Sequence, residues 1–111
     1  MADPDPEKQA GDYEARLAHY LGLLESDNPG DRWKGSEMLG RLGDVRAVEP
    51  LIGLLADDEL VVRIKAAYAL GQIGDPAALR PLQAVYRHEN EEAQEIISHA
   101  MDRIKSTMSR M

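Results

Sequence analysis

The sequence predicts an all-α fold in which three helical hairpins stack side by side, and two observations support this prediction. The phrase "MLGRLGD" at residues 38–44 returns as "ALGQIGD" at 69–75, and residues 16–106 as a whole align with themselves at this offset of 31. Apolar residues between Val62 and Ile73 recur at steps of three and four, which is helical spacing, and no stretch alternates as a strand would. The offset divides the chain into three units, at about 14–44, 45–75 and 76–106.

The repeated phrase is predicted to mark where helices end and where they touch. Gly43 and Gly74 stand just beyond the second helix of a unit, where a left-handed residue closes a helix and glycine adopts that conformation at little cost. The aspartate after each glycine is placed to cap the next helix with a side-chain oxygen. Gly40 and Gly71 lie inside the second helix, at a cost of up to ~1 kcal/mol relative to alanine. We therefore expect another helix to approach closely at these two positions.

Two motifs resemble the HEAT-like repeats of the bilin-lyase type. They read "GDVRAVEPLIGLL" at residues 43–55 and "VRIKAAYALGQIGD" at 62–75, and the resemblance extends over most of the 111 residues. It implies a right-handed α-solenoid of three HEAT-like helical hairpins. The third unit departs from the pattern, with Gln94 where the second unit has Arg63. A polar terminal unit is what the end of a stacked array requires.

The resemblance also implies a structural ladder between neighbouring units. In the family, an arginine that opens the second helix pairs with the aspartate that follows the helix-closing glycine. The corresponding residues of this chain are Arg32, Arg63, Asp44 and Asp75.

The acidic side chains are concentrated near the N-terminus. Residues 1–31 hold eight acidic and two basic side chains, and the remaining 80 residues hold twelve acidic and eleven basic ones. Residues 1–11 are predicted to form a disordered acidic tail, and 12–111 to form the three-unit domain. The net charge of −7 argues against nucleic acid as a partner, because such binding needs a concentrated basic face.

Composition excludes several further classes of protein. The chain has no cysteine, which rules out disulfides, thiolate metal sites and cysteine nucleophiles. It has one tryptophan and no phenylalanine, so the core is expected to be aliphatic. No apolar run approaches the roughly 20 residues of a membrane span, and the N-terminus lacks the basic start and apolar stretch of a signal peptide. We expect a cytoplasmic protein without membrane contact.

No catalytic, metal or cofactor site is predicted. His88-Glu89 resembles the His-Glu pairs of hydroxylases built from HEAT-like hairpins, which bind two irons through several such pairs at positions equivalent to Ile64-Lys65. Here the pair occurs once and falls in a turn. The acidic clusters at 57–59 and 89–92 directly precede second helices, where carboxylates serve capping. No phosphate loop, nucleophile elbow or catalytic carboxylate pair is present.

The second helices are predicted to carry a partner-binding patch. Ile64 and Tyr68, four residues apart, share a stripe that is distinct from the core positions of their helix. Residues one repeat away become neighbours when the units stack, since packed helices lie about 8–10 Å apart. The predicted patch, with Lys34 at its rim, comprises Trp33, Glu37, Arg41, Ile64, Tyr68, Gln72, Glu95, His99 and Arg103. Its aromatic and arginine content is typical of protein interfaces. The alternative is that Trp33 packs against the second unit and that Tyr68 is an ordinary half-exposed aromatic.

These observations favour a non-catalytic protein–protein interaction or scaffold module that binds an unidentified protein on the concave face of the second helices. The alternative is a subunit or relative of a bilin lyase, in which Arg41, Arg103 and His99 would pair with tetrapyrrole propionates. A third hypothesis is an iron-dependent hydroxylase. The protein is expected to be a monomer or to self-associate weakly through the ends of the solenoid.

Overall fold

The computed structural model describes the backbone of residues 6–110 and the side chains of residues 11–110. The α-helices are α1 (Pro6–Leu23), α2 (Pro29–Leu42), α3 (Val48–Gly53), α4 (Leu60–Ile73), α5 (Leu79–Tyr86) and α6 (Glu91–Met108). Short 3-10 helices are η1 (Val45–Ala47), η2 (Leu54–Ala56) and η3 (Pro76–Ala78). Within this part of the chain there is no strand, so the all-α prediction is confirmed.

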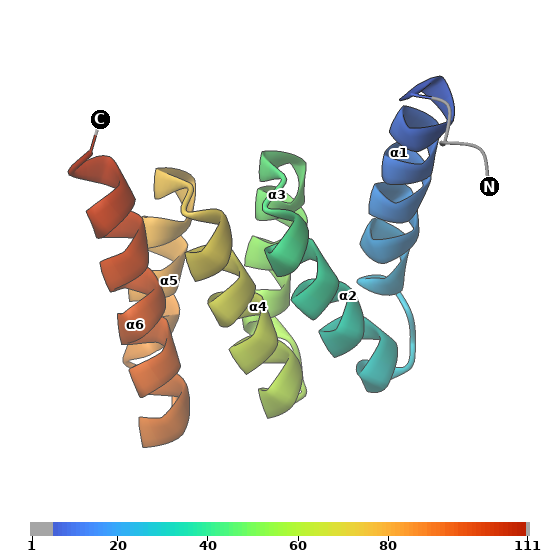
Figure 1. The fold of residues 1–111 in the computed structure, drawn as a ribbon. Helices are drawn as coiled ribbons and strands as arrows, with labels where there is room; N and C mark the ends of the chain where they lie inside the picture. Colours follow the sequence, from blue (N-terminus) through green and yellow to red (C-terminus); the bar gives the residue numbers. More distant parts are fainter. Residues whose placement is uncertain (1–5, 111) are drawn as a thin grey trace.

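The helices form a row of packed pairs (Figure 1). α1 packs on α2, α3 on α4 and α5 on α6, while α2, α4 and α6 lie side by side with α4 in the middle. α1 and α6 stand at opposite ends of the row. Residues one repeat apart on α2, α4 and α6 therefore follow one another across a single face, which we call the α2–α4–α6 face.

Two glycines set the spacing between these three helices, as predicted. A Cβ atom on Gly40 would lie 2.9 Å from the Cα of Ala69, and one on Gly71 would lie 2.8 Å from the Cα of Ala100. Real Cβ atoms do not come this close to backbone. The same contact thus joins α2 to α4 and α4 to α6, with both of its residues shifted by the repeat offset of 31.

The turns between units are also as predicted. Gly43 and Gly74 adopt φ values of 68° and 78°, the left-handed conformation that ends α2 and α4. The side chain of Asp44 accepts a hydrogen bond from the backbone N–H of Arg46 at 2.9 Å, and Asp75 accepts the corresponding bond at 2.8 Å. The capped element is in each case a 3-10 turn, which continues into α3 or α5.

A single aliphatic core runs through the whole row, from Leu17 on α1 to Ile104 on α6. Its fully buried large side chains include Leu39, Leu51 and Leu70. Burying a leucine completely contributes about 1.5–3 kcal/mol. The core is continuous because α4 presents buried residues to helices on both sides of it.

The N-terminal boundary differs from the prediction. Residues 1–5 of the expected tail lie outside the described residues, but α1 begins at Pro6, so residues 6–11 belong to a helix. Proline suits the first helical position, where its missing N–H is no loss, and the residues "EKQA" after it are good helix formers. None of the helices in the described chain is both long and apolar enough to cross a membrane.

Candidate partner-binding surface

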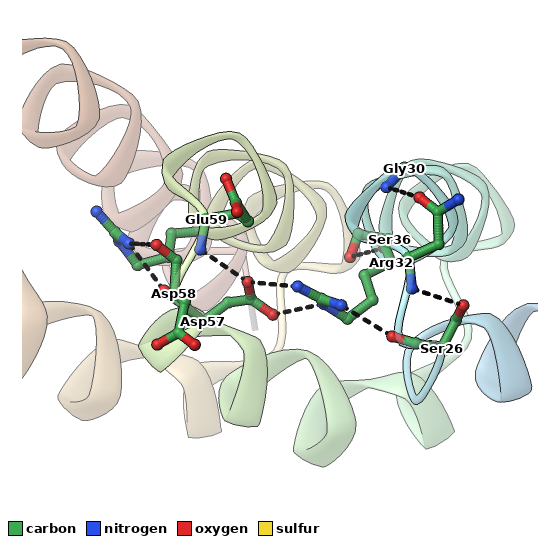
Figure 2. Close-up of polar contacts among 9 residues, drawn as sticks. Ser26, Gly30, Arg32, Ser36, Asp57, Asp58 and Glu59 are labelled. Atoms are coloured by element: carbon green, nitrogen blue, oxygen red, sulfur yellow. Dashed lines mark hydrogen bonds and ion pairs between the residues drawn. The ribbon is translucent and has the colours of Figure 1, made fainter.

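Arginine side chains tie the N-terminal ends of α2 and α4 to the following unit, and Figure 2 shows the first of these links, from Arg32 to Asp57. Arg32 donates from Nε and Nη2 to the two carboxylate oxygens of Asp57, at 2.8 and 3.1 Å. Its Nη1 donates to the carbonyl oxygen of Ser26 at 2.8 Å. The guanidinium thus bridges the turn that precedes α2 and the turn that precedes α4.

Arg63 repeats this arrangement one unit later. It donates to the two carboxylate oxygens of Glu89, at 2.6 and 3.4 Å, and to the carbonyl oxygen of Asp57 at 2.8 Å. Asp57 therefore accepts hydrogen bonds from Arg32 through its side-chain carboxylate and from Arg63 through its backbone carbonyl oxygen. The ladder ends at Gln94, whose amide donates to the carbonyl oxygen of Tyr86 within the last unit.

The prediction that Asp44 and Asp75 are the acidic partners in this ladder was wrong. Arg32 and Arg63 do form it, but Asp57 and Glu89 accept their hydrogen bonds in place of Asp44 and Asp75. The reason is geometric. Arg32 opens α2 and Asp44 follows its end, so at 1.5 Å per residue they stand roughly 18 Å apart. An acid in the turn before the neighbouring helix lies at the correct end.

The two aspartates have different electrostatic surroundings. Burial opposes ionisation of Asp57, but the hydrogen bonds from Arg32 and from the Glu59 amide outweigh it and lower the pKa of this carboxyl. The side chain and the backbone N–H of Arg46 hold the pKa of Asp44 well below its usual range. Asp44 also accepts a hydrogen bond from the hydroxyl of Tyr13 at 3.0 Å, which fastens α1 to η1. Both carboxylates serve to join elements.

Part of the predicted patch surrounds a hollow between α2 and α4 on the α2–α4–α6 face. This central hollow, of about 270 Å³, is lined by Glu37, Arg41, Lys65, Tyr68 and Gln72. Tyr68 is 45% exposed and Tyr86 is 37% exposed, so the ring of Tyr68 is open to a partner. A second hollow, the C-terminal hollow, is lined by Gly71, Gln72, Arg103, Ser106, Thr107 and Arg110. Gln72 belongs to both, so the two hollows adjoin.

Lys65 is a member of this surface that the sequence analysis missed. Its ammonium lies 5.3 Å from the ring centroid of Trp33 and 3.7 Å from a carboxylate oxygen of Glu37. It therefore covers part of the half-buried indole by a cation–π contact. The sequence held a signal for it, because Lys34, a predicted rim residue, occupies the equivalent position one repeat earlier.

Three further residues of the predicted patch do not line the central hollow: Ile64, Glu95 and His99. His99 and Glu95 line an outer hollow on α6 together with Tyr86 of α5. Ile64 is half-buried and lines none of the three hollows. The patch is thus divided on α6, where Glu95 and His99 line the outer hollow but Arg103 lines the C-terminal hollow.

The His88-Glu89 pair has the geometry of a turn. His88 is exposed, whereas the side chain of Glu89 is 8% exposed and occupied by Arg63. Residues 11–110 contain no group of three or more histidine and carboxylate side chains arranged to hold a metal ion.

Repeated helical pairs with a shared core define a class of helical repeat proteins, and comparison identifies the family. A family model for HEAT repeats matches residues 17–102, so the chain belongs to the HEAT repeat family. Among solved structures, it is similar to human deoxyhypusine hydroxylase in complex with glycerol, with a TM-score of 0.75 and 28% sequence identity. The match covers 85% of this chain and 33% of that one, so the chain spans about a third of the hydroxylase. Comparison with curated proteins gave no match.

Proposed function

We propose that this chain is a non-catalytic interaction module that binds another protein in the cytoplasm. In this proposal the helical pairs form a right-handed solenoid of three HEAT-like hairpins, and the α2–α4–α6 face is its concave side. HEAT repeats are compatible with such a role, since stacked repeats create extended binding surfaces.

The observation that carries the proposal is the central hollow. It sets the exposed ring of Tyr68 among Arg41, Lys65 and Gln72. Tyrosine and arginine are among the residue types that dominate binding energy at protein interfaces, particularly where surrounding contacts exclude water from an aromatic anchor. The two helices α2 and α4 hold these side chains on regular elements, so little ordering cost accompanies docking.

The two enzymatic alternatives have weaker support. The bilin-lyase hypothesis requires His99 to act with Arg41 and Arg103, but His99 lines a different hollow from Arg41. The hydroxylase hypothesis draws on the likeness to human deoxyhypusine hydroxylase, of which the chain covers a third. In this chain a His-Glu pair occurs once, and the glutamate of that pair, Glu89, forms an ion pair with Arg63.

Replacing Tyr68 tests the proposal. We expect Tyr68→Ala to reduce capture of the native partner by about tenfold or more while leaving the melting temperature nearly unchanged, because an exposed anchor contributes to binding and not to folding. Quantitative pull-down and thermal unfolding by circular dichroism provide the two measurements. Arg80→Ala, at an exposed position on α5, is the control and should capture the partner as the wild type does.

Trp33→Ala distinguishes a binding role from a packing role for the neighbouring indole. Because Trp33 is half-buried beneath Lys65, we expect this variant to lose ~1–3 kcal/mol of stability.

Equal capture of the native partner by wild type and by Tyr68→Ala would contradict the proposed function. A fall in melting temperature for Tyr68→Ala as large as that for Trp33→Ala would assign Tyr68 to the core.

A further inference from the structure

Basic side chains gather around two adjoining hollows on the α2–α4–α6 face, although the chain as a whole carries −7. The central and C-terminal hollows together contain four cationic side chains and one carboxylate. The basic side chains are Arg41, Lys65, Arg103 and Arg110, and the carboxylate is Glu37. We call this region, together with Tyr68 and Gln72, the basic strip.

The cations of the basic strip are incompletely neutralised. Glu37 lies 3.6 Å from Arg41 and 3.7 Å from Lys65, so one carboxylate faces two cations. The side chain of Arg41 remains 64% exposed. Arg103 is exposed and has no ion pair with any residue in the described part of the chain. The strip therefore retains positive charge that a partner can use.

The opposite ends of the same helices are acidic. The turns and first turns of α2, α4 and α6 carry Asp31, Asp58, Glu59, Glu91 and Glu92. A long polyanion lying across the whole face would meet these carboxylates, which disfavours nucleic acid. A short acidic segment confined to the basic strip avoids them, because the Debye length at physiological salt is about 8 Å.

The repeat fixes the spacing of the strip. Gln72 lines both hollows, so Arg41, Gln72 and Arg103 stand in one row across three helices. Neighbouring helices lie about 8–10 Å apart, which puts Arg41 and Arg103 roughly 16–20 Å apart. An extended chain advances about 3.3–3.6 Å per residue, so roughly five or six residues span this distance. Tyr68 lies between the two ends of such a segment.

We infer that the basic strip binds an extended acidic peptide segment of the partner protein. Acidic residues at the two ends of the segment pair with Arg41 and Arg103, and an apolar residue near its middle contacts the ring of Tyr68. Gln72 lies beneath the segment and offers an amide to its backbone. This inference rests on the proposed function and specifies the chemistry of the partner.

Charge reversal tests the inference against a matched control. The probe is a fluorescent peptide with glutamates at both ends, about five residues apart, and a central leucine. We expect the full chain to bind this probe at physiological salt and to reject the same peptide with lysines in place of glutamates. Arg41→Glu combined with Arg103→Glu should weaken binding at least about tenfold, because attraction becomes repulsion at both ends.

The control combines Arg80→Glu and Arg87→Glu, which change the net charge equally at exposed positions outside the strip. We expect it to alter affinity by less than about twofold, since these sites lie beyond effective electrostatic range. Equal weakening by both double variants would overturn the inference, as would failure of the wild type to bind the glutamate peptide. Tighter binding of a single-stranded oligothymidine than of the peptide would also overturn it.

The inference and the proposed function fail separately. If the peptide does not bind but Tyr68→Ala still abolishes capture of the native partner, the face binds protein and only the acidic chemistry is wrong. If Tyr68→Ala has no effect on capture, the proposed function itself is wrong.

Discussion

At the scale of single residues, the contact between Gly71 and Ala100 determines how closely α4 and α6 pack. Gly71→Ala would place a methyl group 2.8 Å from backbone that belongs to a helix and moves only with it. Overpacking of this kind costs about 1–3 kcal/mol and exceeds the gain in helix propensity of up to ~1 kcal/mol. We expect a net loss of stability, measured by urea unfolding.

Gly22→Ala is the matched control for this substitution. Gly22 also lies in a helix, but a Cβ there meets nothing within 4 Å. Helix propensity then acts alone, and we expect a gain of about 0.5–1 kcal/mol. If both alanine variants changed stability in the same direction, the close approach of α4 and α6 would not be what retains Gly71.

The carboxylate of Asp57 makes the stability of the chain depend on pH. Its pKa is lower in the folded chain than in the unfolded chain, so its contribution to stability is present above the ordinary aspartate pKa and is lost as the pH falls through the lower, folded value. We expect Asp57→Asn to cost on the order of 1 kcal/mol at pH 7, allowing for partial solvent screening. The difference from wild type should shrink as the pH falls through the ordinary aspartate range and below it.

Unfolding by urea at a series of pH values measures this dependence. Asp27→Asn is the control, because Asp27 is exposed and has no hydrogen bond to a described side chain. A pH-independent difference between wild type and Asp57→Asn would show that the carboxylate charge contributes nothing to the ladder.

The sequence predicted the arginines of the ladder but not their acidic partners. The repeat placed Arg32 and Arg63 correctly, since both open a second helix. It did not identify Asp57 and Glu89 as their partners, because an offset alignment gives the position of a residue along a helix but not which end of it faces a neighbour. Glu89 has a different side chain and is offset by 32 from Asp57, which further concealed the equivalence.

At the scale of elements, Asp44 and Asp75 have a common role and one difference. Each caps a 3-10 turn through a backbone N–H. Only Asp44 also accepts hydrogen bonds from Tyr13 of α1 and from the side chain of Arg46, which in turn binds Glu14 of α1. Asp44 therefore caps η1 and also attaches α1 to it.

Substituting both aspartates separates these roles. We expect Asp75→Ala to cost ~1 kcal/mol, the usual effect of losing a cap. Asp44→Ala should cost more, because α1 loses its attachment to η1 at the same time. Hydrogen exchange provides the measurement: amides of α1 should exchange faster in Asp44→Ala but not in Asp75→Ala. Equal exchange rates of the α1 amides in the two variants would contradict the attachment of α1 by Asp44.

Element type and the turns between units were predictable because glycine, aspartate and the three-four spacing act locally. Gly43 and Gly74 end α2 and α4, and the aspartate after each glycine caps the next 3-10 turn. The start of α1 at Pro6 was not predicted, since charge composition outweighed the helix-forming residues after the proline. The candidate site was predicted only in part, because whether Ile64 or His99 reaches the hollow depends on helix rotation, which a repeat offset does not specify.

At the scale of the whole molecule, the continuous core predicts a single unfolding transition. Leu70 on α4 is fully buried, and α4 packs against both α2 and α6. We expect Leu70→Ala to cost about 2–5 kcal/mol. Fluorescence of the single tryptophan, on α2, and circular dichroism of all helices should shift together by the same amount.

Val45→Ala is the control for this prediction, because Val45 is 62% exposed and its truncation should change stability by less than about 0.5 kcal/mol. Separate fluorescence and dichroism transitions in wild type or Leu70→Ala would show that α2 unfolds independently of the rest of the row.

The end of the ladder at Gln94 has a consequence for building with this fold. The first unit offers Arg32, the middle unit accepts it and offers Arg63, and the last unit only accepts. A second copy of residues 45–75, spliced between Asp75 and Pro76, would preserve this order and leave the closing unit in place. Chains lengthened in this way would serve as a molecular ruler, with each insert adding one fixed step.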